Sequence, residues 1–124
     1  MGEILKIDSI EKYYGNKGNI LKAFDGKTTL DYKDVIVISK KILKNNGLLS
    51  IVHRPENLMD ILMFMRSNNI EPKKIRFVYP YKGKNANILL VEGAKNGKPG
   101  LKVMDPLYVY ENGNYTEEIK KYFE

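Results

Sequence analysis

Apolar residues follow two different spacings in the first part of the chain, and the change of spacing predicts where strands and helices lie. Residues 3–14 alternate weakly between apolar and polar, which indicates a short strand. After a Gly/Asn-rich turn, residues 30–43 carry apolar side chains at helical spacing: Val35, Ile38 and Ile42, flanked by Ile36 and Leu43. Thr28 or Thr29 is suited to cap this helix, and Asn46-Gly47 to end it in a left-handed turn.

A short apolar run and a second helical pattern follow. Residues 48–52, Leu-Leu-Ser-Ile-Val, lie between a glycine and a charged corner and predict a buried strand. Four apolar residues then recur with the spacing of one helical face: Leu58, Ile61, Leu62 and Met65. Pro55 and Glu56 favour a helix start, because proline lacks the N–H that a first turn leaves unpaired and glutamate suits the positive helix end. Asn68-Asn69 closes this helix.

The last third of the chain is mostly extended. Residues 73–81 and 85–95 predict the two strands of a β-hairpin, joined by the basic loop Tyr-Lys-Gly-Lys-Asn. An extended segment, a hairpin turn and a short capped helix complete the chain: 101–110, Asn112-Gly113, and 117–123 after Thr116.

The order strand, helix, strand, helix, strand, strand predicts an α/β fold. Strands that alternate with helices favour a parallel sheet, to which the terminal hairpin adds an antiparallel edge. This is the C-terminal half of a doubly wound sheet, and residues 1–124 are expected to form a single domain, since no linker or repeat divides them. The first strand would normally pair with another parallel strand that nothing in the chain supplies, so we expect self-association or a partner that completes the sheet.

Composition excludes several classes of function. Cysteine is absent and His53 is the only histidine, which excludes thiolate chemistry and zinc sites built from Cys or several His residues; no metal is expected. No apolar run approaches the ~20 residues that cross a bilayer, so no membrane partner is expected. The lack of cysteine is typical of a cytoplasmic protein.

Positive charge is concentrated in one segment. The formal net charge is +6, and between residues 72 and 104 Glu92 is the only acidic residue. The basic residues of this segment are Lys73, Lys74, Arg76, Lys82, Lys84, Lys95, Lys98 and Lys102. A segment with this imbalance is typical of a surface that faces phosphates.

Three motifs carry a resemblance to a known family. They are His-Arg-Pro-Glu at 53–56, Gly-Lys-Asn-Ala-Asn at 83–87, and Val-Glu-Gly-Ala-Lys-Asn-Gly-Lys-Pro-Gly-Leu-Lys-Val at 91–103. With the segment from 106 to 119, they resemble the C-terminal half of the bacterial S-adenosylmethionine-dependent tRNA adenine-N6 methyltransferases, which modify the adenine beside the anticodon of a valine tRNA. The resemblance runs from about Thr28 to the C-terminus and implies a Rossmann-like fold, S-adenosylmethionine as cofactor and tRNA as partner.

The chain also departs from this family. It contains no Gly-x-Gly-x-x-Gly turn, and the cofactor-binding half of the family has no counterpart in it. The family's Asn-Pro-Pro-Tyr base clamp corresponds to a segment in which Tyr13 or Tyr14 stands as a degenerate remnant, without the asparagine and the prolines. Methylation of an exocyclic amine depends mainly on positioning the nitrogen in line with the methyl group. The resemblance therefore implies part of a methyltransferase that binds no cofactor and is inactive by itself, with no catalytic residue of its own.

The His-Arg-Pro-Glu corner has two interpretations. His53 and Arg54 follow a predicted strand, at the end where open α/β sheets bind ligands, so they are candidates for contact with substrate or RNA phosphates. The structural alternative is that Arg54 pairs with a nearby carboxylate such as Glu56 and that His53 stabilises the corner, because the same residues make a good helix start.

The hairpin loop and the following turn supply the other RNA-binding candidates: Lys82, Lys84, Asn85, Asn87, Lys95, Lys98 and Lys102. Lysines would contact phosphates, and asparagines bases or sugars. The alternative is a solvated turn, in which these residue types are common. Four tyrosines on the last strands could stack bases but more often pack a sheet: Tyr79, Tyr81, Tyr108 and Tyr110.

Three functions follow from these observations. The first is the C-terminal portion of a tRNA adenine-N6 methyltransferase that supplies its substrate side and RNA surface. The second is a non-catalytic RNA-binding module, and the third is a subunit of a split methyltransferase whose partner binds the cofactor. Tight RNA binding that weakens steeply with salt would favour the second. A neighbouring gene that encodes a half with the glycine-rich loop would favour the third, and an intact upstream reading frame in the same gene would establish the first.

Overall fold

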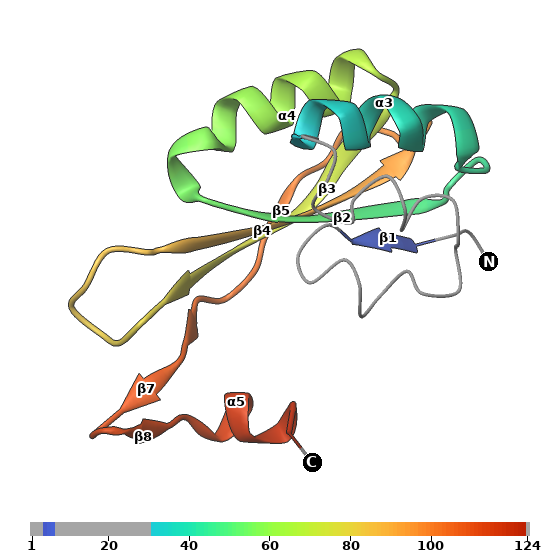
Figure 1. Cartoon of the computed structure of the whole chain (residues 1–124). Coiled ribbons are helices and arrows are strands. Elements are labelled where there is room, and N and C mark those ends of the chain that lie inside the picture. Colours follow the sequence, from blue (N-terminus) through green and yellow to red (C-terminus); the bar gives the residue numbers. More distant parts are fainter. Residues whose placement is uncertain (1–3, 7–30, 124) are drawn as a thin grey trace.

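The strands of the main sheet are arranged in the order β1-β2-β4-β3-β5, and β6 also pairs with β3. The computed structural model describes residues 4–6 and 31–123. The sheet strands are β1 (Ile4–Lys6), β2 (Leu48–His53), β3 (Ile70–Tyr79), β4 (Ile88–Lys95), β5 (Lys102–Val103) and β6 (Leu107–Tyr108). Helices α3 (Tyr32–Ile42) and α4 (Leu58–Ser67) both lie over one face of the sheet (Figure 1). The predicted α/β class is confirmed.

The position of β4 corrects one expectation. The hairpin of β3 and β4 forms as predicted, but β4 lies between β2 and β3 and pairs antiparallel with both, so it does not form an edge. Helix α4 connects β2 to β3, and these two strands run parallel to each other without pairing. Strand β4 runs in the opposite direction and lies between them. Leu89 and Val91 of β4 are consequently buried under the helices. The predicted parallel pairing is seen between β1 and β2.

Helix α3 begins at a different cap from the one expected. Asp31 is the N-cap: its carboxylate accepts hydrogen bonds from the backbone N–H groups of Lys33 (2.9 Å) and Asp34 (3.2 Å). The Asp34 side chain accepts from the N–H of Asp31, which completes a capping box. The prediction of Thr28 or Thr29 as cap was wrong, because Asp31 satisfies two N–H groups at once. As predicted, Asn46 adopts a left-handed conformation (φ 65°) after the helix.

The inward face of α3 also differs from the predicted one. Val35 and Ile36 are buried, whereas Ile42 is 38% exposed. The buried stripe passes through Ser39, whose Oγ donates a hydrogen bond to the carbonyl oxygen of Val35 (2.7 Å). Because its hydroxyl is hydrogen-bonded within the helix, Ser39 can be buried without the energetic cost of an unpaired polar group. A prediction that follows only apolar residues does not place such a serine on the buried face.

The core lies between the two helices and the sheet. Its buried side chains are Val35, Ile36, Leu43, Leu49, Ile51, Ile61, Met65, Ile70, Ile75, Leu89 and Val91. The predicted entry to α4 is confirmed: Pro55–Asn57 form a 3-10 turn with proline in its first turn, and Ile61 and Met65 of the helix are fully buried. The predicted end at Asn68-Asn69 is also seen.

The C-terminal segment attaches to the end of β3. After β6 follow the hairpin strands β7 (Tyr110–Glu111) and β8 (Asn114–Tyr115) and helix α5 (Glu117–Lys121). Asn112 (φ 52°) and Gly113 (φ 81°) form the predicted turn, which requires positive φ at both positions. Thr116 is the N-cap of α5, but its hydroxyl donates to the carbonyl of Tyr108 (2.6 Å). In the described residues, no helix has both the length and the apolar character that a membrane crossing requires.

One ion pair makes the stability of this fold depend on pH. The guanidinium of Arg66 donates two hydrogen bonds to the nearly buried carboxylate of Glu71, which holds the pKa of Glu71 below its usual range. A lowered pKa in the folded state contributes stability above the ordinary glutamate pKa, and this stability is lost as pH falls through the folded-state value. We therefore expect Glu71→Gln to lower the melting temperature at pH 7 and to have a progressively smaller effect toward pH 3. An equal loss at both pH values in thermal melts would contradict this prediction.

Candidate functional site

His53 is held in place at the end of β2 by two neighbours. Its Nδ1 lies 3.0 Å from the side-chain amide nitrogen of Asn57, and its ring contacts Tyr32 edge-on at 5.3 Å between centroids. An amide NH₂ can only donate, so this contact suits an unprotonated Nδ1 that accepts the hydrogen bond. These two contacts support the structural interpretation of His53. Sequence reasoning missed both partners, although Asn57 lies only four residues after His53.

Arg54 does not form the ion pair expected of it. Among the described residues the ion pairs are Arg66–Glu71, Arg76–Glu118 and Lys120–Glu117, so the predicted pairing of Arg54 with Glu56 was wrong. The extended backbone of Arg54 (φ −85°, ψ 143°) directs the chain into the turn at Pro55. Its side chain is exposed, and no carboxylate of the described residues pairs with its guanidinium.

A shallow hollow brings three of the sequence candidates together. Val52, His53, Arg54, Asn87 and Ile88 line a cavity of about 370 Å³ at the carboxyl end of β2. Asn87 reaches this position because its N–H donates to the carbonyl of Val78 (3.0 Å), at the start of β4 beside the end of β3. A guanidinium, an imidazole and an amide around one hollow are suited to hold an anion or a polar ring edge.

The basic loop extends beyond this hollow at the same end of the sheet. Lys82, Lys84 and Asn85 are exposed, and Gly83 takes the left-handed conformation (φ 96°) that the tight turn requires. Lys84 donates its N–H to the carbonyl of Tyr81 (3.2 Å), and its ammonium lies 5.7 Å from the centroid of the Tyr81 ring. The loop therefore presents two exposed lysines, one of which lies over an aromatic ring.

The remaining candidates lie away from this loop. Lys95 is the last residue of β4, about 24 Å from its first residue at about 3.4 Å per residue. Its ammonium donates to the carbonyls of Lys40 and Leu43, at the C-terminal end of α3, where a cation is favourable. Lys98 belongs to the turn after β4, where its carbonyl accepts a hydrogen bond from the ammonium of Lys73 (2.6 Å), and Lys102 lies beside Lys74 on neighbouring strands. The candidates thus form two separate groups, and Lys95 has a structural role.

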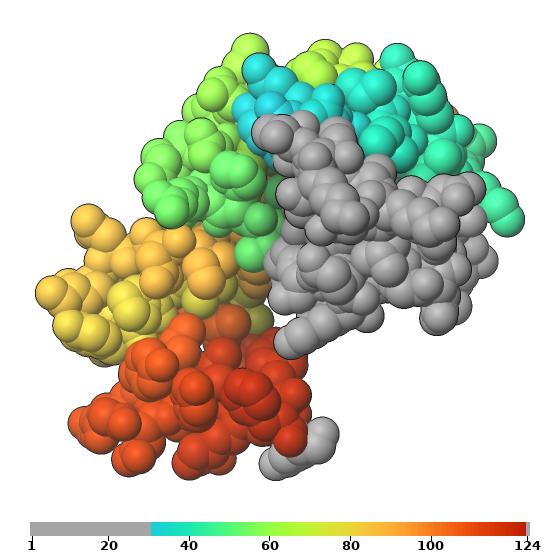
Figure 2. Space-filling view, in the orientation of Figure 1, coloured from blue at the N-terminus to red at the C-terminus, as the bar shows by residue number. Residues whose placement is uncertain are grey.

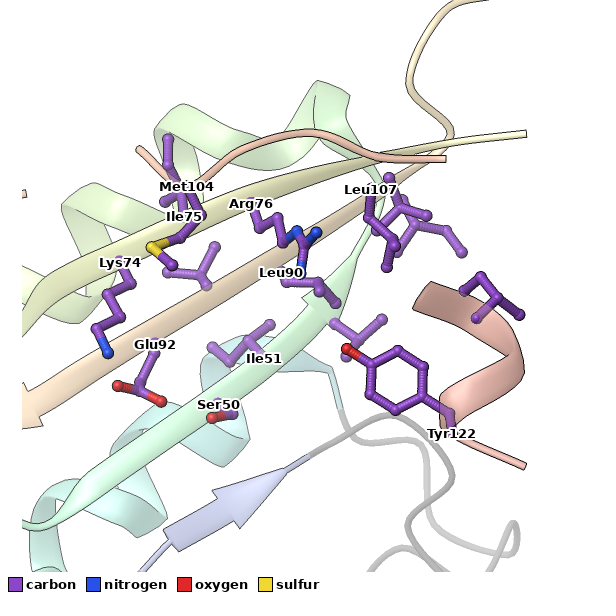
Figure 3. Close-up of a pocket in the computed structure, with 15 residues that line it drawn as sticks. Ser50, Ile51, Lys74, Ile75, Arg76, Leu90, Glu92, Met104, Leu107 and Tyr122 are labelled. Carbon is purple, nitrogen blue, oxygen red and sulfur yellow. The ribbon is translucent and has the colours of Figure 1, made fainter. Parts of the chain in front are cut away.

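The face of the sheet opposite α3 and α4 holds a further cavity of about 500 Å³. Register places Ser50, Glu92 and Lys74 in one row across β2, β4 and β3, and Val52, Leu90 and Arg76 in the next row. Figure 3 shows the polar row on one side of this face and Tyr122, next to α5, on the other. Sequence reasoning did not find this cavity, because it depends on which strands become neighbours.

Comparison with known proteins gives a structural match only. No protein-family model matches the sequence, and no curated protein matches it. The crystal structure of a predicted O-methyltransferase from Agrobacterium tumefaciens shares 25% sequence identity with this chain at a TM-score of 0.67, over 73% of this chain and 44% of its own. This is a methyltransferase fold. The complex of M1.HpyAVI with SAM aligns at a TM-score of 0.43 and 12% identity, over 86% of this chain and 67% of its own. The chain thus spans less than half the length of the O-methyltransferase that it resembles.

The described junction between β2 and α4 lacks one feature of a nucleotide-type cofactor site. A nucleotide-type cofactor needs a glycine-rich turn that lets backbone N–H groups approach it. The strand-to-helix junction after β2 instead runs His53-Arg54-Pro55-Glu56, with no glycine and with one N–H removed by proline. The candidate remnants Tyr13 and Tyr14 lie outside the described residues. Within the described ranges, no three His, Cys, Asp or Glu side chains gather as metal ligands.

Proposed function

We propose that this chain is the C-terminal portion of an S-adenosylmethionine-dependent tRNA adenine-N6 methyltransferase, inactive on its own. The observation that carries the proposal is the match of 73% of the chain to only 44% of an O-methyltransferase structure. Such a match is expected of one half of a methyltransferase fold. The choice of tRNA and of the adenine amino group rests on the resemblance of the motifs at residues 53–56, 83–87 and 91–103 to that family.

In this proposal the chain binds and orients RNA. Arg54 and the loop lysines contact phosphates, and Asn87 offers its amide to a base or ribose beside the fixed ring of His53. The cofactor, when bound by the other half of the fold, supplies the methyl group. The contribution of this chain is to hold the target strand still, since positioning accounts for most of what amine methylation requires.

The proposed partner is a polypeptide that supplies the cofactor half. Strand β1 is the terminal strand of the sheet among the described residues and runs parallel to β2, so a further parallel strand can extend the sheet there. Self-association through the same strand is the alternative. Sedimentation of the chain alone and with a cofactor-binding half distinguishes the two.

Two measurements test the proposed function. Calorimetric titration of the folded chain with S-adenosylmethionine is expected to give no heat, and micromolar binding would overturn the claim of inactivity. Labelled methyl transfer into an unmodified tRNA transcript is expected only when a cofactor-binding half is added. Digestion of that RNA should then place the label on adenine N6. Label on an oxygen atom, or none with any half that binds the chain, would overturn the assignment.

The non-catalytic RNA-binding module is the second candidate, favoured by the Lys84 ammonium over the exposed ring of Tyr81. In that case RNA binding by the chain alone would be strong, would weaken steeply with salt, and would be unchanged by the cofactor half.

A further inference from the structure

The C-terminal hairpin and the basic loop together form an aromatic cleft. Tyr81 and Tyr110 line a hollow of about 380 Å³ with Asn112 and Gly113. The same two tyrosines border an adjoining cavity of about 540 Å³ with Lys82, Tyr108 and Thr116 among its walls. We call the two hollows the tyrosine cleft. Figure 2 shows the loop (yellow) and the C-terminal segment (red) side by side at one end of the molecule.

Backbone hydrogen bonds fix the walls of the tyrosine cleft. The N–H of Val109 donates to the carbonyl of Tyr79 (2.9 Å), and the N–H of Tyr110 donates to the carbonyl of Pro80 (2.8 Å). In the wall of the cleft, the ring of Tyr108 stacks on that of Tyr79 at 5.3 Å between centroids. On the hairpin, Tyr110 stacks on Tyr115 at the same distance with an angle of 15° between the planes. Backbone hydrogen bonds and ring stacking thus hold the segments that carry Tyr108 and Tyr110.

Contacts within the fold leave much of the Tyr81 and Tyr110 rings uncovered, although Tyr110 stacks on Tyr115. Tyr79 and Tyr108 bury part of their rings against each other, as tyrosines on strands usually do. Tyr81 remains 47% exposed and Tyr110 43% exposed. Exposed flat rings around one hollow leave apolar surface in water unless a ligand covers it.

The charges around the tyrosine cleft favour an anionic ligand with a flat ring. Lys82 lines the cleft and Lys84 lies over the Tyr81 ring, while Glu111 is the acidic residue in the wall. Asn112 and Thr116 add polar groups to the same wall. Single-stranded nucleic acid combines the two features that this arrangement matches, since bases stack on aromatic rings and phosphates attract lysines.

We propose that the tyrosine cleft binds an unpaired nucleobase of single-stranded RNA, stacked on Tyr81 or Tyr110, with Lys82 and Lys84 on the flanking phosphates. The proposal deepens the proposed function and rests on it for the choice of RNA. It assigns the hairpin end of the chain a role in recognising a loop in which bases are not paired. A fully paired helix offers no base face to such a cleft.

Fluorescence anisotropy with the full chain tests the site. The probes are a labelled RNA hairpin with an unpaired seven-nucleotide loop and a fully paired RNA duplex of equal length. Tyr81→Leu is expected to weaken hairpin binding roughly 5- to 100-fold, the range typical for loss of one base stack, while Tyr81→Phe keeps it. Lys82→Gln is expected to reduce the salt dependence by about one charge. Tyr122→Leu and Lys41→Gln, at exposed positions outside the cleft, are the matched controls and should bind like the parent chain.

Several results would overturn the proposal. Equal affinity for hairpin and duplex, an unchanged affinity in Tyr81→Leu, or an equal loss in Tyr81→Phe would each exclude base stacking. Absence of binding to both RNAs would overturn it too and leave the cleft to a protein ligand. Circular dichroism establishes that each variant is folded. Tyr81 is chosen for substitution in preference to Tyr110 because it lies in a loop, where a substitution disturbs the fold less. RNA binding is read independently of methyl transfer, so a failed transfer assay with intact loop preference would overturn the proposed function and leave the cleft standing.

Discussion

Replacement of Gly93 by valine is expected to destabilise the chain by about 3 kcal/mol or more. A Cβ atom at Gly93 would overlap the terminal methyl of Met65, and would lie 2.8 Å from Cγ2 of Ile70 and 3.1 Å from the carbonyl oxygen of Glu71. The Met65 methyl can move, but Ile70 and the backbone of β3 are fixed by the sheet. Gly93→Ala should therefore cost about 1–3 kcal/mol, and the two further methyl groups of valine should add to it. Urea unfolding followed by circular dichroism measures both.

A double-mutant cycle identifies the cause. Met65→Ala alone leaves a cavity and is expected to cost about 2–5 kcal/mol. If steric overlap explains the Gly93 effect, Gly93→Ala should cost less in the Met65→Ala background, with a coupling of about 0.5–3 kcal/mol. Additive losses, or a Gly93→Val chain as stable as the parent, would show that α4 does not pack on β4 as closely as the structure indicates.

The motif that contains Gly93 shows which properties of the fold and of the site the sequence could predict. Gly93 and Lys95 both belong to the motif that carries the family resemblance, and both turn out to have structural roles: one makes room for α4 and the other binds the end of α3. A motif of this kind is a sound predictor of the fold, because it records how helices pack on the sheet. It says much less about chemistry.

Local patterns predicted the local structure well. The helix over 58–67, the β3–β4 hairpin and the Asn112-Gly113 turn follow from residue spacing and turn chemistry, which act within a few residues. The insertion of β4 between β2 and β3 did not follow, because strand order depends on pairings between residues about 40 positions apart, such as Ile51 with Val91. The same limit hid the sheet-face cavity and the tyrosine cleft.

The candidate site was found only in part. His53 and Asn87 were selected for separate reasons, and register brought them to one hollow. Lys95 was selected for its charge, yet its ammonium is occupied by helix carbonyls. Charge counts along a sequence cannot separate a cation that faces solvent from one that binds the backbone. Only the exposed fraction and the partners of each group make that distinction.

Replacement of Arg76 by methionine is expected to loosen the C-terminal segment and, with it, the tyrosine cleft. Arg76 Nε donates to the carbonyl of Asp105 (2.8 Å), and its two terminal nitrogens contact the two carboxylate oxygens of Glu118 at 2.8 and 2.7 Å. The hydrogen bond and charge of Glu118 raise the pKa of Arg76, so the guanidinium stays charged. The contacts with Glu118 tie α5 to β3, and the contact with Asp105 ties the segment before β6 to the same strand.

The expected free-energy cost of Arg76→Met follows from the exposure of the ion pair between Arg76 and Glu118. Arg76 is mostly covered, but the Glu118 side chain is 44% exposed, so solvent screening reduces the contribution to about 1–2 kcal/mol. Opening of the segment should then be roughly 5- to 30-fold more frequent, since 1.4 kcal/mol corresponds to a factor of ten. Hydrogen exchange read at residues 117–121 measures this directly, and exchange in β2 and β4 should not change.

Lys120→Met provides the matched control. Lys120 pairs with Glu117 within α5 at 3.3 Å, and both side chains are largely exposed, so its removal should change exchange by less than about twofold. If Arg76→Met behaved like Lys120→Met, the contact to Glu118 would not be what holds α5 on the sheet. If exchange rose as expected and hairpin RNA binding fell with it, the placement of the C-terminal segment would be a condition for binding. A cleft whose hairpin wall has come loose cannot hold a base in a fixed stack. If the segment loosened and RNA affinity did not fall, the C-terminal hairpin would therefore not be part of the RNA-binding site.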